Sequence, residues 1–132
     1  RLFAEKPHWR QYVEPNLNSE LGLGVVVPAP NPRLTTGLYI DVDGGQITIG
    51  MDWYHVHVWG ESEDTIEQAM LFIQEFVDEK IVLLAYFEGD KWIRSQCVGL
   101  EDPWRPPGEE ERRLVFSWKA NLDSEMIGLI SN

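Results

Sequence analysis

The sequence predicts an α+β fold in which one mostly antiparallel sheet of about six strands packs, in two layers, with one amphipathic helix. Three observations support this prediction. Strand-like segments stand before and after a single segment of helical periodicity, which gives the order β-β-β-α-β-β-β. Short turn sequences join neighbouring strand segments, which favours antiparallel pairing. The length of 132 residues suits one domain with its own core.

The first 34 residues are the least regular part of the chain. The run "VVVPAPNPRL" contains three prolines, each of which fixes its backbone and removes a hydrogen-bond donor. We therefore expect residues 1–34 to form an extended N-terminal arm with at most a short strand or helical turn. This arm is predicted to pack on a core of residues 35–132, so that residues 1–132 make a single domain.

Three strands are predicted before the helix. The runs "GLYIDV" and "QITIG" flank "DGG" at residues 43–45, which is a strong signal for a hairpin turn. The next run, "DWYHVHVW" at residues 52–59, alternates and is rich in residues that favour strands. It predicts a third strand that ends at Gly60.

The helix is predicted over residues 63–79, with Ser62 or Asp64 as its N-cap. One helical face is apolar, formed by Ile66, Ala69, Met70, Ile73, Phe76 and Val77. Acidic residues cover much of the remaining surface. Those in the first turn suit the positive end of the helix dipole.

The remaining strands follow the helix. The apolar run "IVLLAYF" at 81–87 is typical of a central strand, and the turn "EGD" leads into its partner at 91–99. A proline-containing loop precedes the strand predicted at 113–122, and the tail is expected to add a helical turn or an edge strand. Exposed edge strands at 38–42 or 113–122 would permit pairing of two copies, so monomer and homodimer both stay open.

The charge of the chain bears on its partners. Its net charge is −11, from 22 acids and 11 bases, and residues 61–80 hold seven acids against one base. This balance argues against binding to nucleic acid or anionic membranes and favours a basic protein partner. No apolar run approaches the roughly 20 residues that span a bilayer. The single cysteine, Cys97, fits a reducing compartment, so we expect a cytoplasmic protein.

Two histidines suggest a metal site as an alternative function. Alternation places Trp53, His55, His57 and Trp59 on one face of the third strand, where two imidazoles about 6–7 Å apart can ligate one metal. With Glu61, the spacing His-x-His-x3-Glu resembles the first metal motif of the cupins. The chain lacks the downstream histidine of that family, and a helix is predicted where cupins continue with strands. A small metal-dependent enzyme or metal-binding protein using His55, His57 and Glu61 is therefore the second hypothesis.

Tryptophans beside carboxylates predict a protein interface. Six tryptophans are many for this length, and some are expected in the core. An aromatic anchor among acids is typical of an interface with a basic partner. The predicted partner-binding residues are Trp59, Glu61, Glu63, Asp64 and Glu67, with Asp90 and Trp92 as a second patch. Alternatively, each tryptophan closes the edge of a thin core. No catalytic residue and no cofactor are predicted on this hypothesis.

Residues 45–99 also resemble a known family. "ITIGMDWYHVHVW", an acidic amphipathic helix and "FVDEKIVLLAYFEGDKWIRSQCV" resemble small bacterial immunity proteins encoded beside polymorphic or contact-dependent toxins. The resemblance implies a non-enzymatic protein that binds and neutralises one cognate toxin domain in the cytoplasm. Many such toxin domains are nucleases or other cationic enzymes. The interface residues above come from charge and residue type, because the resemblance carries no motif for them.

Overall fold

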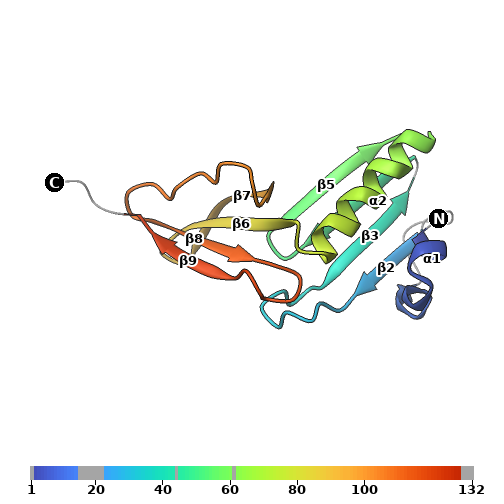
Figure 1. Ribbon diagram of the computed structural model, residues 1–132, viewed down its shortest axis with the longest axis horizontal. Helices are drawn as coiled ribbons and strands as arrows, with labels where there is room; N and C mark the ends of the chain where they lie inside the picture. The colour runs from blue at the N-terminus through green and yellow to red at the C-terminus, as the bar shows by residue number, and fades with distance from the viewer. Residues whose placement is uncertain (1, 15–22, 44, 61, 129–132) are drawn as a thin grey trace. The chain divides into compact units, whose positions relative to one another are not determined.

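The computed structural model describes residues 2–14, 23–43, 45–60 and 62–128, and it confirms the α+β class (Figure 1). The chain divides into two compact units, residues 1–29 with 34–74 and residues 30–33 with 75–132. The elements are α1 (Leu2–Glu5), the 3-10 helix η1 (Pro7–Tyr12), β1 (Val13–Glu14), β2 (Leu23–Val27), β3 (Leu38–Asp43), β4 (Gln46–Met51), β5 (Tyr54–Trp59), α2 (Glu63–Val77), β6 (Ile81–Glu88), β7 (Lys91–Gly99), β8 (Glu111–Phe116) and β9 (Ser124–Ile127).

The first unit contains an antiparallel sheet with the strand order β1-β2-β3-β4-β5. The hairpin predicted at "DGG" is confirmed, because Asp43 pairs with Gln46 and Gly45 has a φ of 81°, which favours glycine. A second hairpin joins β4 to β5, and its turn consists of residues 52–53. The third strand therefore starts two residues later than predicted, because these two residues reverse the chain.

The turn between β4 and β5 is tied to the segment that precedes β3. The Asp52 carboxylate accepts hydrogen bonds from the backbone N–H groups and hydroxyls of Thr35 and Thr36. Burial alone would raise the pKa of the Asp52 carboxyl, but the hydrogen bonds from the two threonines hold it below its usual value. The ionised carboxylate thus links the turn before β5 to the segment before β3.

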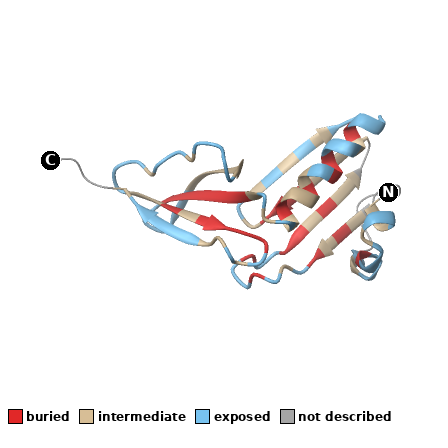
Figure 2. Ribbon diagram, viewed as in Figure 1, coloured by how far each residue is buried: buried red, intermediate tan, exposed pale blue. Residues whose placement is uncertain are grey.

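Helix α2 lies against one face of this sheet (Figure 1). The Ser62 hydroxyl accepts a hydrogen bond of 3.2 Å from the Thr65 backbone N–H, which confirms the predicted N-cap. The predicted apolar face is buried at Ala69, Met70 and Ile73, while the opposite side of the helix is exposed (Figure 2). The spacing of apolar residues therefore located this helix correctly.

The N-terminal residues add two strands to the sheet. Residues 1–34, predicted to hold at most a short strand or helical turn, contribute α1, η1, β1 and β2. Strand β2 pairs with β3, and Val25 and Val27 are buried. Pro28 follows directly after β2, where the backbone no longer has to donate a hydrogen bond to the sheet.

The second unit contains an antiparallel sheet with the order β7-β6-β8-β9. The predicted turn after β6 is confirmed, because Glu88 pairs with Lys91 and Gly89 has a φ of 63°. Strand β6 is central, and its residues 82–87 are all buried (Figure 2). The tail forms the edge strand β9, and an edge strand is one of the two structures predicted for it.

The prediction of one six-stranded sheet is wrong, because the strands form two separate sheets. Strand β6 is hydrogen-bonded to β7 on one edge and to β8 on the other, so it offers no backbone groups to the strands before the helix. Both predicted edge strands are also wrong. β3 lies between β2 and β4, and β8 lies between β6 and β9.

Hydrogen bonds hold the loop between β7 and β8 on the second sheet. The Tyr86 hydroxyl donates to the Arg105 carbonyl at 2.5 Å, and the Trp104 indole donates to the Gly99 carbonyl at 3.0 Å. Arg94 donates two hydrogen bonds to the Glu111 carboxylate, at 2.6 and 3.1 Å. Trp104 packs against the cluster of Val82, Leu84, Tyr86 and Val115, so this loop completes the core.

A second polar cluster attaches residues 30–33 to this unit. The fully buried Asn31 amide donates to the Ser117 carbonyl at 2.8 Å and to the Asp123 carboxylate at 2.9 Å. Asp123 also accepts from the Ser117 backbone N–H at 2.7 Å, from the Ser117 hydroxyl at 3.0 Å and from Arg33 at 3.1 Å. One carboxylate therefore joins two segments that lie far apart in the sequence.

Candidate functional site

The candidate site lies on β5, the last strand of the first sheet. Tyr54, Val56 and Val58 are half-buried, whereas the alternate residues His55, His57 and Trp59 are exposed. Trp59 is 70% exposed, the most of any large hydrophobic residue described. We name the surface of His55, His57, Trp59 and their neighbours Tyr39, Gln46 and Thr48 the histidine face.

The aromatic rings of the histidine face are close together, as the alternation predicts. The ring centroids of His55 and His57 are 5.0 Å apart, with an angle of 67° between the ring planes. The His57 and Trp59 rings follow at 6.5 Å. Trp53, which the sequence placed on the same face, lies in the turn before β5 and is 37% exposed.

Strand β4 supplies hydrogen-bonding partners to His57. The strand register places Thr48 across from His57 and Gln46 across from Trp59. The Thr48 hydroxyl lies 2.9 Å from His57 Nδ1, and the Gln46 side-chain amide contacts the same nitrogen. This contact directs Nδ1 towards β4 and leaves Nε2 on the opposite side of the ring. Sequence reasoning missed both partners, because the register depends on the unexpected turn at residues 52–53.

A glycine creates room for an aromatic ring beside His55. Gly50 pairs with His55 on one side and with Tyr39 on the other. A Cβ atom at Gly50 would lie 2.2 Å from the Cζ and hydroxyl of Tyr39, so the Tyr39 ring occupies the space of the missing side chain. Burial raises the pKa of the Tyr39 hydroxyl.

The first turn of α2 carries the predicted acidic residues. Glu63, Asp64 and Glu67 are all exposed. The Thr65 hydroxyl donates a hydrogen bond of 3.3 Å to the Trp59 carbonyl, so the end of β5 adjoins this turn. The structure thus places the Trp59 backbone beside the acidic turn, while the Trp59 side chain lies on the histidine face. Glu61, which belongs to both hypotheses, lies outside the described residues.

The second predicted patch belongs to the second unit. Asp90 is exposed in the turn between β6 and β7, and Trp92 is 44% exposed. The Trp92 indole donates a hydrogen bond of 2.7 Å to the Ser95 hydroxyl. Asp90 and Trp92 are therefore both accessible.

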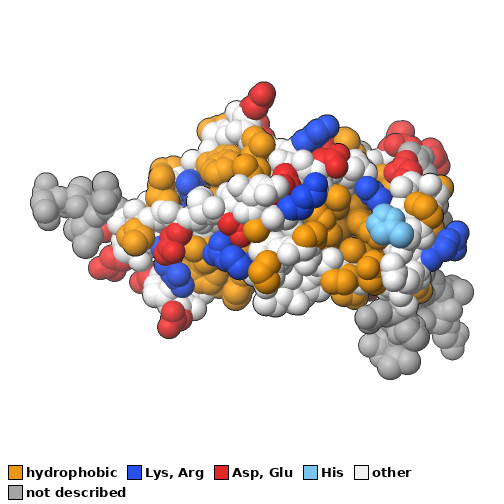
Figure 3. Space-filling view, turned by 60° about the horizontal axis from the view of Figure 1, so that its bottom comes forward, with side chains coloured by type: hydrophobic (Ala, Val, Ile, Leu, Met, Phe, Trp, Pro, Cys, Tyr) orange, Lys and Arg blue, Asp and Glu red, His pale blue; other side chains and the backbone are white. Residues whose placement is uncertain are grey.

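Negative charge does not cover every surface evenly. On the face drawn in Figure 3, Lys and Arg side chains stand among the Asp and Glu side chains, with hydrophobic side chains between them. The densest run of acids remains the segment from Glu61 to Glu79. The highest density of acidic residues along the chain is therefore in α2 and its flanks.

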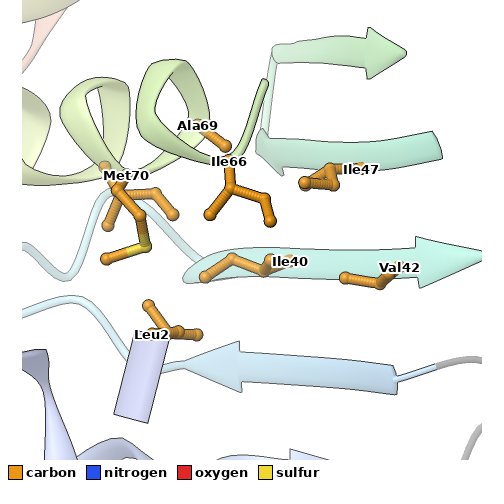
Figure 4. A pocket seen from close by; sticks show the side chains of 8 residues that line it. Leu2, Ile40, Val42, Ile47, Ile66, Ala69 and Met70 are labelled. Carbon is orange, nitrogen blue, oxygen red and sulfur yellow. The ribbon is translucent and has the colours of Figure 1, made fainter. Parts of the chain in front are cut away.

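An apolar pocket of about 230 Å³ lies inside the first unit (Figure 4). Helix α2 borders it on one side, and β3, β4 and α1 border it on the others. The lining side chains are Leu2, Ile40, Val42, Ile47, Ile66, Ala69, Met70 and Ile73. None of these side chains can transfer a proton, act as a nucleophile or ligate a hard metal ion.

Other groups with reactive potential are few in the described ranges. Among residues 2–14, 23–43, 45–60 and 62–128, no three His, Cys, Asp or Glu side chains gather closely enough to hold a metal ion together. Cys97 is half-buried, and burial raises the pKa of its thiol to about 12. This thiol is therefore protonated at neutral pH and unsuited to nucleophilic attack.

In the part of the chain that the structure describes, no helix is both long and apolar enough to cross a membrane. Comparisons of the chain with protein-family models, with curated proteins and with solved structures found no match.

Proposed function

We propose that this chain is a non-enzymatic immunity protein that binds and neutralises a basic bacterial toxin domain in the cytoplasm. The observation that supports the proposal best is the position of Trp59. Its ring is 70% exposed, and its carbonyl is bonded to the helical turn that carries Glu63, Asp64 and Glu67.

An aromatic anchor and a carboxylate cluster have complementary roles at an interface. A tryptophan that loses its hydration contributes more binding energy than most residues, and it slows dissociation. The carboxylates attract a basic partner and speed association, an effect that salt weakens. The helix N-terminus carries a partial charge of only about +0.5, which three carboxylates outweigh. The partner is a basic protein, for example a nuclease. Asp90 and Trp92 form a second contact region in this proposal.

The test uses the toxin domain encoded next to the gene of this chain. Co-expression should restore growth to cells that produce the toxin domain. Binding rates at about 50 and 200 mM salt then report on the interface. The charge-reversed variant Glu63→Lys/Asp64→Lys/Glu67→Lys should associate at least about 10-fold more slowly at low salt and show a flatter salt dependence.

A matched control reverses three exposed carboxylates elsewhere, in the variant Glu101→Lys/Glu109→Lys/Glu110→Lys. It changes the net charge equally but leaves the acidic turn intact. Equal slowing by both variants would mean that only the net charge matters and would contradict the assigned interface. No protection against the toxin domain would contradict the proposed function itself.

A second pair of variants isolates the aromatic anchor. Trp59→Ala should raise the dissociation rate about 30-fold, which corresponds to about 2 kcal/mol of binding free energy. Leu71→Ala removes another exposed hydrophobic side chain, one that is 59% exposed on α2, and should change dissociation little. Neither change should shift the melting temperature appreciably, because neither side chain is buried.

A further inference from the structure

The pair of imidazoles on β5 satisfies the spacing requirement of a metal chelate. With metal–nitrogen bonds of about 2.0–2.1 Å and bond angles of about 90–109°, two rings on one ion have centroids roughly 4.5–5.3 Å apart. The His55 and His57 centroids are 5.0 Å apart. Because both rings are exposed, an ion can reach them without any opening of the core.

The surroundings of His57 favour one ligating nitrogen. A histidine that binds a metal through one nitrogen commonly has its other nitrogen held by a hydrogen bond, which fixes the ring and its tautomer. His57 Nδ1 lies 2.9 Å from the Thr48 hydroxyl, whose oxygen can accept a hydrogen bond from a protonated Nδ1. In that tautomer Nε2 carries the free lone pair and is the nitrogen available to a metal.

The neighbouring side chains limit motion and add negative charge. The Tyr39 ring fills the position across from His55, on the side of β4. Asp41 pairs with Thr48, which in turn pairs with His57, so one carboxylate lies in the same row two strands away. The net charge of −11 also favours cations near the surface.

We propose that His55 and His57 chelate one divalent transition-metal ion through two imidazole nitrogens, with water in the remaining positions. Imidazole ligands suit Cu²⁺, Ni²⁺ and Zn²⁺, and the general order of affinity places Cu²⁺ first. The proposed chelate does not rest on the proposed binding of a toxin domain.

The purified chain is titrated with CuCl₂, NiCl₂ or ZnCl₂ in a weakly coordinating buffer, and the heat of binding is measured by calorimetry. One Cu²⁺ per chain is expected, bound more tightly than Ni²⁺ or Zn²⁺. Each of His55→Ala and His57→Ala should lower the Cu²⁺ affinity at least about 100-fold, and Thr48→Val about 10-fold through the loss of the contact to Nδ1. His8→Ala is the matched control, because His8 is also exposed but lies on η1, and it should leave the affinity unchanged.

Two spectroscopic measurements distinguish a chelate from loose surface binding. Paramagnetic resonance of the Cu²⁺ complex should show coupling to two imidazole nitrogens. The bound ion should also quench the fluorescence of Trp59, because its ring lies 6.5 Å from that of His57, and Trp59→Phe should remove that part of the quenching. Binding that survives the double variant His55→Ala/His57→Ala, or that His8→Ala weakens equally, would overturn the proposal.

Discussion

The two compact units differ in the exposure of their most prominent polar clusters. In the second unit, the Arg94–Glu111 pair and the Asp123 cluster join polar groups to one another. In the first unit, the histidine face exposes His55, His57 and Trp59. The difference teaches that the Asp123 cluster stabilises the second unit, while the side chains of the histidine face are accessible to ligands and partners.

Individual tryptophans also differ in exposure, and each unit holds both buried and exposed ones. Trp118 is 5% exposed and lies edge-on to Phe76, with ring centroids 6.2 Å apart. Trp104 donates its indole N–H to a backbone carbonyl within the same unit. Trp59 is 70% exposed and is therefore the tryptophan best placed to meet another molecule.

The largest expected effect tests the polar cluster of the second unit. Asp123→Ala removes the acceptor of the Asn31 amide and of the Ser117 N–H and hydroxyl. Because buried donors are left unpaired, the free energy of unfolding should fall by about 3 kcal/mol, measured by urea denaturation. Glu125→Ala, the control, removes an exposed carboxylate 3.8 Å from Arg112 and should cost at most about 0.5 kcal/mol.

The same variant tests the prediction that the chain is a single domain. In that case, calorimetry should show one cooperative transition that moves as a whole to lower temperature in Asp123→Ala. Two transitions, of which only one moves, would show that the units unfold independently. Equal costs for Asp123→Ala and Glu125→Ala would contradict the structural role of the cluster.

A smaller effect tests the packing of the histidine face. Gly50→Ala places a methyl group where the Tyr39 ring lies, so the ring must move. The free energy of unfolding should therefore fall by about 2 kcal/mol. In a Tyr39→Ala background the space is free, and alanine is better suited than glycine to a strand interior. There, Gly50→Ala should be neutral or stabilise by up to about 1 kcal/mol. The same cost in both backgrounds, measured by denaturation, would rule out the proposed steric cause.

The smallest effect concerns the acid sensitivity of the first unit. The pKa of Asp52 is lowered in the folded state, so its contribution is fully present above the unfolded value of about 3.9. It is lost as the pH falls through the lower folded pKa. Asp52→Asn should cost about 1 kcal/mol at neutral pH and reduce the loss of stability below about pH 4.

Thermal melting from pH 7 to 2 provides the measurement for Asp52. Glu101→Gln, on an exposed loop of the second unit, is the control. It should leave the fall of the melting temperature at low pH unchanged. An Asp52→Asn profile parallel to that of the parent chain would contradict the role of the charged carboxylate.

Much of the local structure could be predicted from the sequence. The alternation of β5 correctly placed His55, His57 and Trp59 on one face, and apolar spacing located α2 with its Ser62 cap. These features depend on residues close in the chain, where strand and helix periods act directly. The turn at Asp52 escaped prediction because its carboxylate is stabilised by Thr35 and Thr36, which lie in a different segment.

Sequence alone determined the α+β class, the hairpins at Gly45 and Gly89, the acidic charge and the placement of the two histidines on one strand face, whereas their exposure is a result of the structure. Tertiary structure decided the division into two sheets, the position of β8 beside β6, and the contacts of His57 with Gln46 and Thr48. The physical reason is that turn and periodicity signals act over a few residues. Whether the strands before the helix pair with those after it depends on which strand edges remain free once the local hairpins have formed.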